Sequence, residues 1–248
     1  MTTAPSVVVH PDKETLAQAV AARLITKLAD AQAARGEATA VLTGGTVGTA
    51  TLAAVADSPA RDSVDWGRVS LWWGDERFVP DGDPERNDEQ AREVFLEKLP
   101  LDPKRVHRYP TSDGPDGDDA AAAASRYAED LIADGGGKLP VFDVLLLGVG
   151  GEGHVASIFP DSEAGRSQRT VVAVLNSPKP PPIRLSLTFP TINTADEVWL
   201  VVGGPDKAEA VGRALSGATL TEVPAAGAHG RTATRWLVDE AAAGQIPR

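Results

Sequence analysis

The chain has 248 residues, of which 42% are hydrophobic and 24% charged, and its formal net charge at neutral pH is −11. It contains no cysteine, which excludes disulfides, thiolate nucleophiles, iron–sulfur clusters and Cys-ligated zinc. No apolar run approaches the roughly 18 residues of a membrane span, the N-terminus lacks a secretory pattern, and an acidic chain binds nucleic-acid phosphates poorly. We therefore expect a cytoplasmic protein with no membrane or nucleic-acid partner.

Apolar periodicity predicts alternating strands and helices in the first part of the chain. In the first helix, Leu16, Val20, Leu24 and Leu28 recur every four residues and Gly36 ends the element. In chain order, the predicted elements are a strand at 6–10, a helix at 12–35, a strand at 39–43, a helix of small residues to about 55, and a strand at 69–73.

The alternation continues in the second part. Asn87 is predicted to cap a helix, because Gln90 stands three residues later, and an acidic Gly/Pro-rich loop follows at 111–119. The further elements are a helix at 120–134, strands at 141–147, 170–175, 183–188 and 198–202, a helix at 206–216, and a final helix or strand–helix segment at 232–243. We expect one α/β domain over residues 1–248, a Rossmann-like open, mostly parallel sheet with helices on both faces.

Ligand sites in open parallel sheets lie beyond the carboxyl ends of the strands, and three strands here end in unusual loops. In the first loop, Gly44, Gly45 and Thr46 follow a strand and open a helix. Glycines let backbone N–H groups approach a ligand and the helix N-terminus favours an anion, although a tight turn also explains these residues. No Gly-Lys-Ser/Thr follows, so a nucleoside triphosphate is not implied.

The second loop places Asp75, Glu76 and Arg77 directly after two tryptophans. These charges either belong to a reactive site or form a surface ion-pair cluster. The acidic run at 81–87 superficially suggests a calcium loop. Arginines occupy the positions of its required glycine and bidentate glutamate, so calcium is excluded there.

The third loop reads Gly-Val-Gly-Gly-Glu-Gly-His at 148–154. Its glycine spacing matches the dinucleotide fingerprint, but the acid expected about 20 residues later is missing, which argues against a nicotinamide cofactor. The loop instead presents His154 beside Glu152. A histidine, with an ordinary pKa of about 6.5, suits proton transfer at neutral pH, and a plain surface histidine is the alternative.

Residues 164–195 carry four cations and no acid inside this acidic chain. Within that stretch, Lys179 is followed by three prolines that stiffen the approach to Arg184 at the edge of a strand. Lys207 begins a helix, where the helix dipole favours acids, so it either faces an anion or is an ordinary solvated lysine. The cations predict a local anion site.

Four motifs occur in order along the chain. They are Leu-Thr-Gly-Gly-Thr at 42–46, Trp-Gly-Asp-Glu-Arg-Phe-Val-Pro at 73–80, Leu-Gly-Val-Gly-Gly-Glu-Gly-His-Val-Ala-Ser-Ile-Phe-Pro at 147–160, and Lys-Pro-Pro-Pro-Ile-Arg-Leu-Ser-Leu at 179–187. Together they resemble the glucosamine-6-phosphate isomerase/6-phosphogluconolactonase family, and within it the lactonases, over nearly the whole chain. The third motif departs from the family's Asp-Gly-His-Thr, because Glu152 and Val155 stand in place of Asp and Thr.

The resemblance implies hydrolysis of 6-phospho-D-glucono-1,5-lactone to 6-phosphogluconate, in the pentose phosphate pathway, with no metal or organic cofactor. By this resemblance, His154 is a general base toward water, and Asp75 or Glu152 orients it. It also implies a small-molecule partner and a monomer or weak homo-oligomer. The implied substrate- and phosphate-binding residues are Gly44, Gly45, Thr46, Arg77, Lys179, Arg184 and Lys207.

Two other functions fit parts of the same sequence. An aldose–ketose isomerase or amino-sugar-phosphate deaminase would keep the fold and depend on a carboxylate base, for which Asp75 is the candidate. A non-catalytic sugar-phosphate sensor would keep the glycine turn, Arg184 and Lys207 and would not need His154. The presence of both His154 and Asp75 favours the lactonase.

Overall fold

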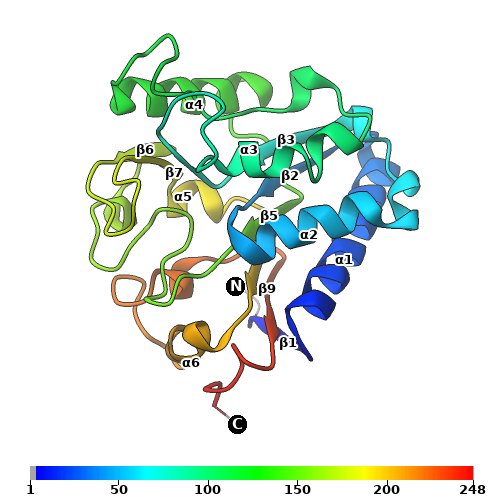
Figure 1. Ribbon diagram of the computed structural model, residues 1–248, viewed down its shortest axis with the longest axis vertical. Helices are drawn as coiled ribbons and strands as arrows, with labels where there is room; N and C mark the ends of the chain where they lie inside the picture. Colours follow the sequence, from blue (N-terminus) through cyan, green and yellow to red (C-terminus); the bar gives the residue numbers. More distant parts are fainter. Residues whose placement is uncertain (1–3, 248) are drawn as a thin grey trace.

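The computed structural model describes residues 4–247 and is built around a six-stranded sheet (Figure 1). The strand order is β1-β9-β8-β5-β2-β3, and every neighbouring pair is parallel. The strands are β1 (Ser6–His10), β2 (Ala38–Leu42), β3 (Val69–Trp73), β5 (Val144–Leu147), β8 (Glu197–Val202) and β9 (Ala233–Asp239). The predicted Rossmann-like parallel sheet is confirmed.

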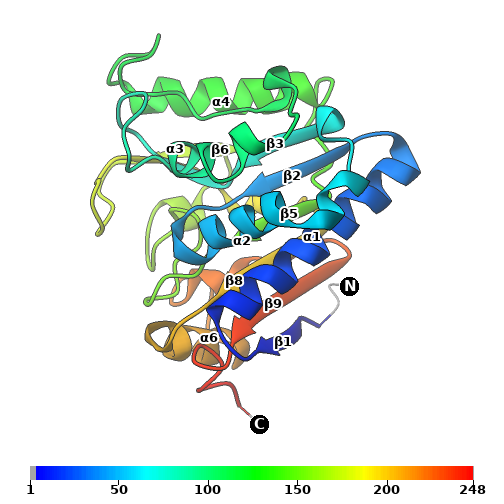
Figure 2. The ribbon, with the colours of Figure 1, turned by 45° about the vertical axis from the view of Figure 1, so that its right-hand side comes forward.

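Helices lie on both sides of this sheet. The helices are α1 (Lys13–Arg35), α2 (Gly45–Asp57), α3 (Asn87–Arg92), α4 (Ala120–Asp134), α5 (Phe189–Ile192) and α6 (Ala208–Leu215). α1 and α2 pack together on one side, whereas α5 and α6 lie on the other (Figures 1 and 2). The caps of α1 agree with the sequence, since Asp12 accepts a hydrogen bond from the Thr15 N–H at 2.7 Å and Gly36 has a φ of 83°. No helix within residues 4–247 has the length and apolar character to cross a bilayer.

A second, smaller sheet corrects the prediction of one sheet. Its order is β4-β7-β6 and both pairings are antiparallel, with β4 at Asp75–Arg77, β6 at Val171–Val174 and β7 at Arg184–Leu187. The connection from β6 to β7 covers only residues 175–183, which is too short for the crossover that parallel neighbours need. The small sheet brings the 74–77 loop of the sequence prediction beside the basic window.

Four predicted boundaries or elements also change. The helix after Asn87 ends at Arg92, and the apolar residues that follow belong partly to a short 3₁₀ turn at Leu96–Lys98. The strand predicted from 141 begins at Val144, and the helix predicted from 206 begins at Ala208 after a 3₁₀ turn. The final segment is the strand β9 and a turn, without a helix.

Buried aromatic residues fix the strand ends that form the site. Trp72, Trp73 and Tyr127 are each at most 1% exposed. The hydroxyl of Tyr127, on α4, accepts a hydrogen bond from the Trp73 N–H at 3.0 Å. A buried hydroxyl with a partner of this kind avoids the cost of an unpaired polar group and ties α4 to the end of β3.

Candidate active site

A cavity of about 410 Å³ opens beyond the carboxyl ends of β2, β3, β5 and β8, where an open parallel sheet is expected to bind ligands. It is lined by every residue that the sequence predicted for the site except Glu152, which lies beside His154. The wall also includes residues that the sequence reasoning missed, among them Lys13, Asn87 and Asp206.

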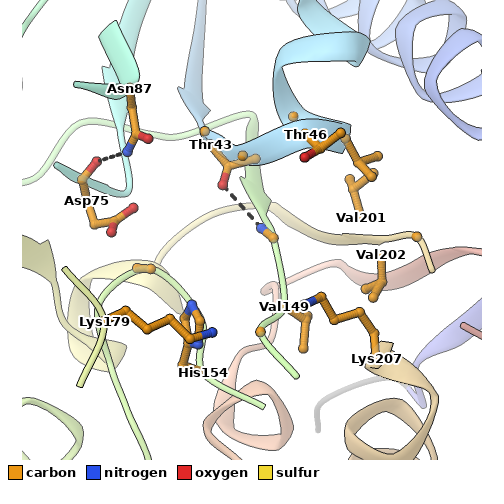
Figure 3. Close-up of a pocket in the computed structure, with 18 of the residues that line it drawn as sticks. Thr43, Thr46, Asp75, Asn87, Val149, His154, Lys179, Val201, Val202 and Lys207 are labelled. Carbon is orange, nitrogen blue, oxygen red and sulfur yellow. Dashed lines mark hydrogen bonds between the residues drawn. The ribbon is translucent and has the colours of Figure 1, made fainter. Parts of the chain in front are cut away.

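The labelled side chains fall on two sides of this cavity (Figure 3). Asp75, His154 and Lys179 lie on one side, and Thr46 and Lys207 lie on the other. Thr43 lies between them, and its hydroxyl accepts a hydrogen bond from the Gly148 N–H at 3.2 Å. The ends of β2 and β5 are therefore joined in the middle of the site.

The glycine-rich loop after β5 is shaped around His154. A Cβ at Gly150 would lie 2.0 Å from His154 Nδ1, so no side chain fits there. Gly153 has a φ of +87°, which favours glycine, and the Gly150 N–H donates to the His154 carbonyl at 2.9 Å. Within the spacing that resembles a dinucleotide fingerprint, Gly150 thus lets the imidazole pack against the loop backbone.

The surroundings of His154 keep its imidazole neutral. Burial lowers its pKa and the charge of Lys179 adds to this effect, while the charges of Glu152 and Asp75 oppose it. His154 Nδ1 lies 3.3 Å from Glu152 Oε1, without the alignment of a hydrogen bond. Since the net pKa of His154 lies below its ordinary value, the ring can accept a proton at neutral pH.

Lys179 extends to the side of the cavity that holds His154. Its ammonium donates to Glu152 Oε2 at 3.0 Å. Burial raises the pKa of Glu152, but the Lys179 hydrogen bond and a hydrogen bond from its own backbone N–H outweigh burial, and the carboxyl stays ionised. The structure therefore brings Lys179, Glu152 and His154 together, on the side opposite Lys207.

Asp75 presents a carboxylate that is held at one oxygen. Its Oδ2 accepts a hydrogen bond from the buried Ser157 hydroxyl at 2.6 Å, and its backbone carbonyl accepts one from Asn87 Nδ2 at 2.9 Å. Asp75 Oδ1 has no hydrogen bond from any of the residues described by the structure. One oxygen is thus available to a ligand.

Arg77 on β4 and Arg184 on β7 lie directly opposite each other in the antiparallel pairing. Arg77 Nη1 donates to the Glu85 carbonyl at 2.8 Å and to Asn87 Oδ1 at 2.5 Å. Arg184 is 5% exposed, and its Nε and Nη2 donate to the carbonyls of residues 179–181 at 3.1–3.2 Å. Arg184 therefore holds the proline segment that carries Lys179, in addition to lining the cavity.

The opposite side of the cavity combines a helix start with two lysines. Gly45 has a φ of +77° and is the first residue of α2, whose backbone N–H groups are free at this end. Lys207 lies 2.7 Å from Asp206, and Lys13 lines the same cavity without an ion pair to any described residue. This side is suited to an anion.

Asn87 and Lys13, which the sequence did not predict for the site, differ in how much signal they carry in the sequence. The sequence predicts Asn87 as a helix cap, but the cap position is Arg86, whose side chain makes no cap hydrogen bond. The Asn87 side chain instead bonds to Asp75 and Arg77, and the Glu76 carboxylate accepts the N–H groups that a cap would satisfy. Lys13 follows a well-formed cap, and nothing in the pattern distinguishes it from a solvated lysine.

The cavity is cationic inside an acidic protein. Its walls carry Lys13, Arg77, Lys179, Arg184 and Lys207 against two acids, and the chain as a whole has a net charge of −11. Among residues 4–247, no group of three or more His, Asp and Glu side chains is placed to hold a metal ion. A neutral imidazole, two carboxylates and an anion-binding side suit proton transfer on a small anionic substrate.

Comparisons with known proteins identify relatives over nearly the whole chain. The family described as glucosamine-6-phosphate isomerases/6-phosphogluconolactonase matches residues 11–236. The chain is 58% identical over 253 residues to a 6-phosphogluconolactonase of Streptomyces coelicolor, covering 100% of this chain and 97% of that one. It is 47% identical over 245 residues to a 6-phosphogluconolactonase of Mycobacterium tuberculosis, covering 98% of each.

Among solved structures, the 6-phosphogluconolactonase of Trypanosoma brucei has a TM-score of 0.84 and 27% sequence identity, with 100% of both chains covered. The chain therefore belongs to the glucosamine-6-phosphate isomerase/6-phosphogluconolactonase family.

Proposed function

We propose that this protein hydrolyses 6-phospho-D-glucono-1,5-lactone to 6-phospho-D-gluconate, the second step of the oxidative pentose phosphate pathway. Relatives that are 58% and 47% identical over nearly the whole chain bear the name of this enzyme. The observation that carries the proposal is His154, a half-buried and neutral imidazole on the wall of a cationic cavity. A lactone hydrolase needs a base that is unprotonated at neutral pH and a site that attracts a phosphorylated sugar.

The substrate phosphate lies against the start of α2, where the N–H groups near Gly45 and Thr46 and the ammonium of Lys207 meet it. The lactone carbonyl then lies toward Asp75, His154 and Lys179 on the other side of the cavity. Holding the distal phosphate fixes the carbonyl relative to the base, so binding energy contributes to the rate.

His154 acts through the ring nitrogen that does not face Glu152. Nδ1 lies 3.3 Å from Glu152 Oε1, and the negative charge of this carboxylate favours the tautomer with the proton on Nδ1, which leaves Nε2 basic. Nε2 takes a proton from water as the water oxygen bonds to the lactone carbonyl carbon. The tetrahedral oxyanion collapses, the bond from that carbon to the ring oxygen breaks, and the imidazolium returns its proton to the leaving oxygen.

The cations on the His154 side balance the charge that develops on the carbonyl oxygen. Lys179 and Arg184 lie there, and Asp75 and Glu152 balance the imidazolium. No step requires a metal or an organic cofactor. The protein acts in the cytoplasm on a free small molecule, as a monomer or weak homo-oligomer, without membrane or nucleic-acid partners.

The direct test is hydrolysis of 6-phosphogluconolactone, corrected for the spontaneous opening of the lactone. We expect His154→Ala to lower kcat/KM by roughly 10²–10⁴ while the fold is retained, and His229→Ala, at a residue that does not line the cavity, to leave it unchanged. A folded His154→Ala protein within a few-fold of the wild-type rate would refute the base role. Release of ammonia from glucosamine 6-phosphate at enzymatic rates would instead assign the site to a deaminase.

A further inference from the structure

Asn87 lines the cavity but has no role in the reaction proposed above. Its side chain is 4% exposed and lies next to Asp75 (Figure 3). It is the first residue of α3, and its side chain makes no cap bond to that helix. Because the buried side-chain amide of Asn87 bonds to site residues and not to its own helix, we look for its function in the site.

The polar groups of Asn87 bond to three consecutive residues of β4. Its Nδ2 donates to the Asp75 carbonyl at 2.9 Å, and its backbone N–H donates to Glu76 Oε1 at 2.7 Å. Its Oδ1 accepts from Arg77 Nη1 at 2.5 Å. The strand that carries two of the predicted site residues is thus attached to the start of α3 at each of its positions.

The junction between β4 and α3 is held from the buried side as well. Glu76 is 1% exposed and accepts the backbone N–H groups of Arg77, Asn87 and Asp88 at 2.7–3.0 Å. These bonds use only the backbone of residue 87. Removing the Asn87 side chain therefore leaves the attachment of Glu76 intact and isolates the contribution of the side-chain amide.

The hydrogen bond between Asn87 and Arg77 Nη1 determines which nitrogen of the Arg77 guanidinium remains available to a ligand. Nη1 is occupied by Asn87 Oδ1 and the Glu85 carbonyl, whereas Nε is buried without a partner among the described residues. Arg77 lines the cavity. Nη2 makes no hydrogen bond to a described residue and can donate one to an oxygen of a ligand in the cavity.

Asn87 also explains why residue 44 is glycine. Gly44 has a φ of −86°, which any residue can adopt, so conformational freedom is not the reason. A Cβ at Gly44 would lie 1.9 Å from Asn87 Oδ1 and 2.4 Å from its Cγ, and the three nearest heavy atoms all belong to this side chain. The turn after β2 and the amide of Asn87 are therefore matched in shape.

We propose that Asn87 is a positioning residue for the reaction, which holds Arg77 so that its free Nη2 meets an oxygen of the sugar-phosphate substrate and which seats the Gly44 turn beside it. The inference rests on the proposed lactonase function. Asn87 acts through Arg77 and the turn and needs no contact with the substrate itself.

A double-mutant cycle with 6-phosphogluconolactone as substrate tests the action through Arg77. We expect Asn87→Ala to lower kcat/KM roughly 10- to 100-fold, as for the loss of a hydrogen bond to a charged group, and to change it by less than twofold when Arg77 is already Ala. Effects of the two substitutions that multiply would overturn the proposal. So would an Asn87→Ala enzyme with wild-type kcat/KM.

Asn193 provides a matched control for a purely structural role. It is a partly buried asparagine whose side chain, like that of Asn87, makes two hydrogen bonds: Nδ2 donates to the Gly227 carbonyl and Oδ1 accepts from the His229 N–H, each at 3.0 Å. Asn193→Ala should lower Tm and leave kcat/KM unchanged. If the wild-type protein does not hydrolyse the lactone, the proposed function fails; if it does and Asn87→Ala behaves like Asn193→Ala, only this inference fails.

The match with Gly44 has its own test. Gly44→Ala should lower kcat/KM at least tenfold in the wild-type background, because the new methyl group must displace the Asn87 amide. In Asn87→Ala protein the same substitution should cost less than threefold, since the atoms at 1.9 and 2.4 Å are gone. Equal losses in both backgrounds would show that Gly44 serves another purpose and would refute the match.

Discussion

The charges of Glu152 and Lys179 act in opposite directions on the pKa of His154, so they predict how each substitution shifts the pH dependence of catalysis. Glu152 Oε1 lies 3.3 Å from His154 Nδ1 and raises the pKa of the imidazole, although burial keeps the net pKa below its ordinary value. Opposite unit charges at that distance attract by roughly 1.3 kcal/mol in a water-like dielectric and by about 5 kcal/mol at a dielectric of 20. Because the Glu152 side chain is 34% exposed and paired with Lys179, the lower figure applies. It corresponds to about a tenfold change in proton affinity.

We therefore expect Glu152→Gln to move the acid limb of the kcat/KM profile to lower pH by about one pH unit. Lys179→Ala should move the limb the other way, because Lys179 lowers the pKa of His154. The assay is the initial rate of lactone opening between pH 5 and 8, with each variant normalised to its own plateau. Glu129→Gln, on the exposed surface of α4, changes the net charge equally and should leave the limb in place. Shifts of the same sign in the Glu152 and Lys179 variants would refute this account of the site.

Three other substitutions test separate parts of the structure. Lys207→Ala should raise KM for the phosphorylated lactone about tenfold or more and leave the rate with unphosphorylated gluconolactone unchanged; unaltered discrimination between the two substrates would place the phosphate elsewhere. Gly150→Ala should abolish most activity with little loss of helix signal in circular dichroism, because the added Cβ would lie 2.0 Å from His154 Nδ1, and a fully active variant would contradict that packing. Burial, followed by the charge of Asp88, raises the pKa of Glu76 from 4.5 to about 7, so its contribution to the free energy of unfolding is complete below pH 4.5 and is lost as the pH rises through 7. The Tm difference between wild type and Glu76→Gln should shrink from pH 5 to 8. A difference that grows over this range would rule out a raised pKa of Glu76 in the folded protein.

The parallel sheet could be predicted because its strands carry their own signal. Buried runs such as Val144–Leu147 are apolar at every position, and Gly36 marks a helix end through its left-handed backbone. β4 carries no such signal, since Asp75–Arg77 has three charged residues and becomes a strand only through its pairing with β7. Contacts of this kind between distant segments are not encoded in local periodicity.

The same distinction separates the site residues. The sequence could single out His154 because the glycines around it are visible in the sequence, and one of them, Gly150, makes room for the ring. It could not single out Asn87, because the role of Asn87 depends on Glu76 accepting the N–H groups at the start of α3. The pairing of Lys179 with Glu152 likewise depends on Arg184, which holds the carbonyls of the intervening proline segment.

The strand β9 pairs with β1 and also supports the anion-binding side of the cavity. In the main sheet β1 pairs only with β9, and Asp239 at the end of β9 accepts the Gly204 N–H through both carboxylate oxygens at 3.0 Å. Gly204, with a φ of +110°, begins the turn that carries Lys207. Because β1 comes before β9 in the chain, β1 must wait during synthesis without its partner in the main sheet until β9 is made, and the Lys207 turn gains its anchor only then. A chain that stalls before β9 therefore lacks both the partner of β1 and the anchor of the Lys207 turn.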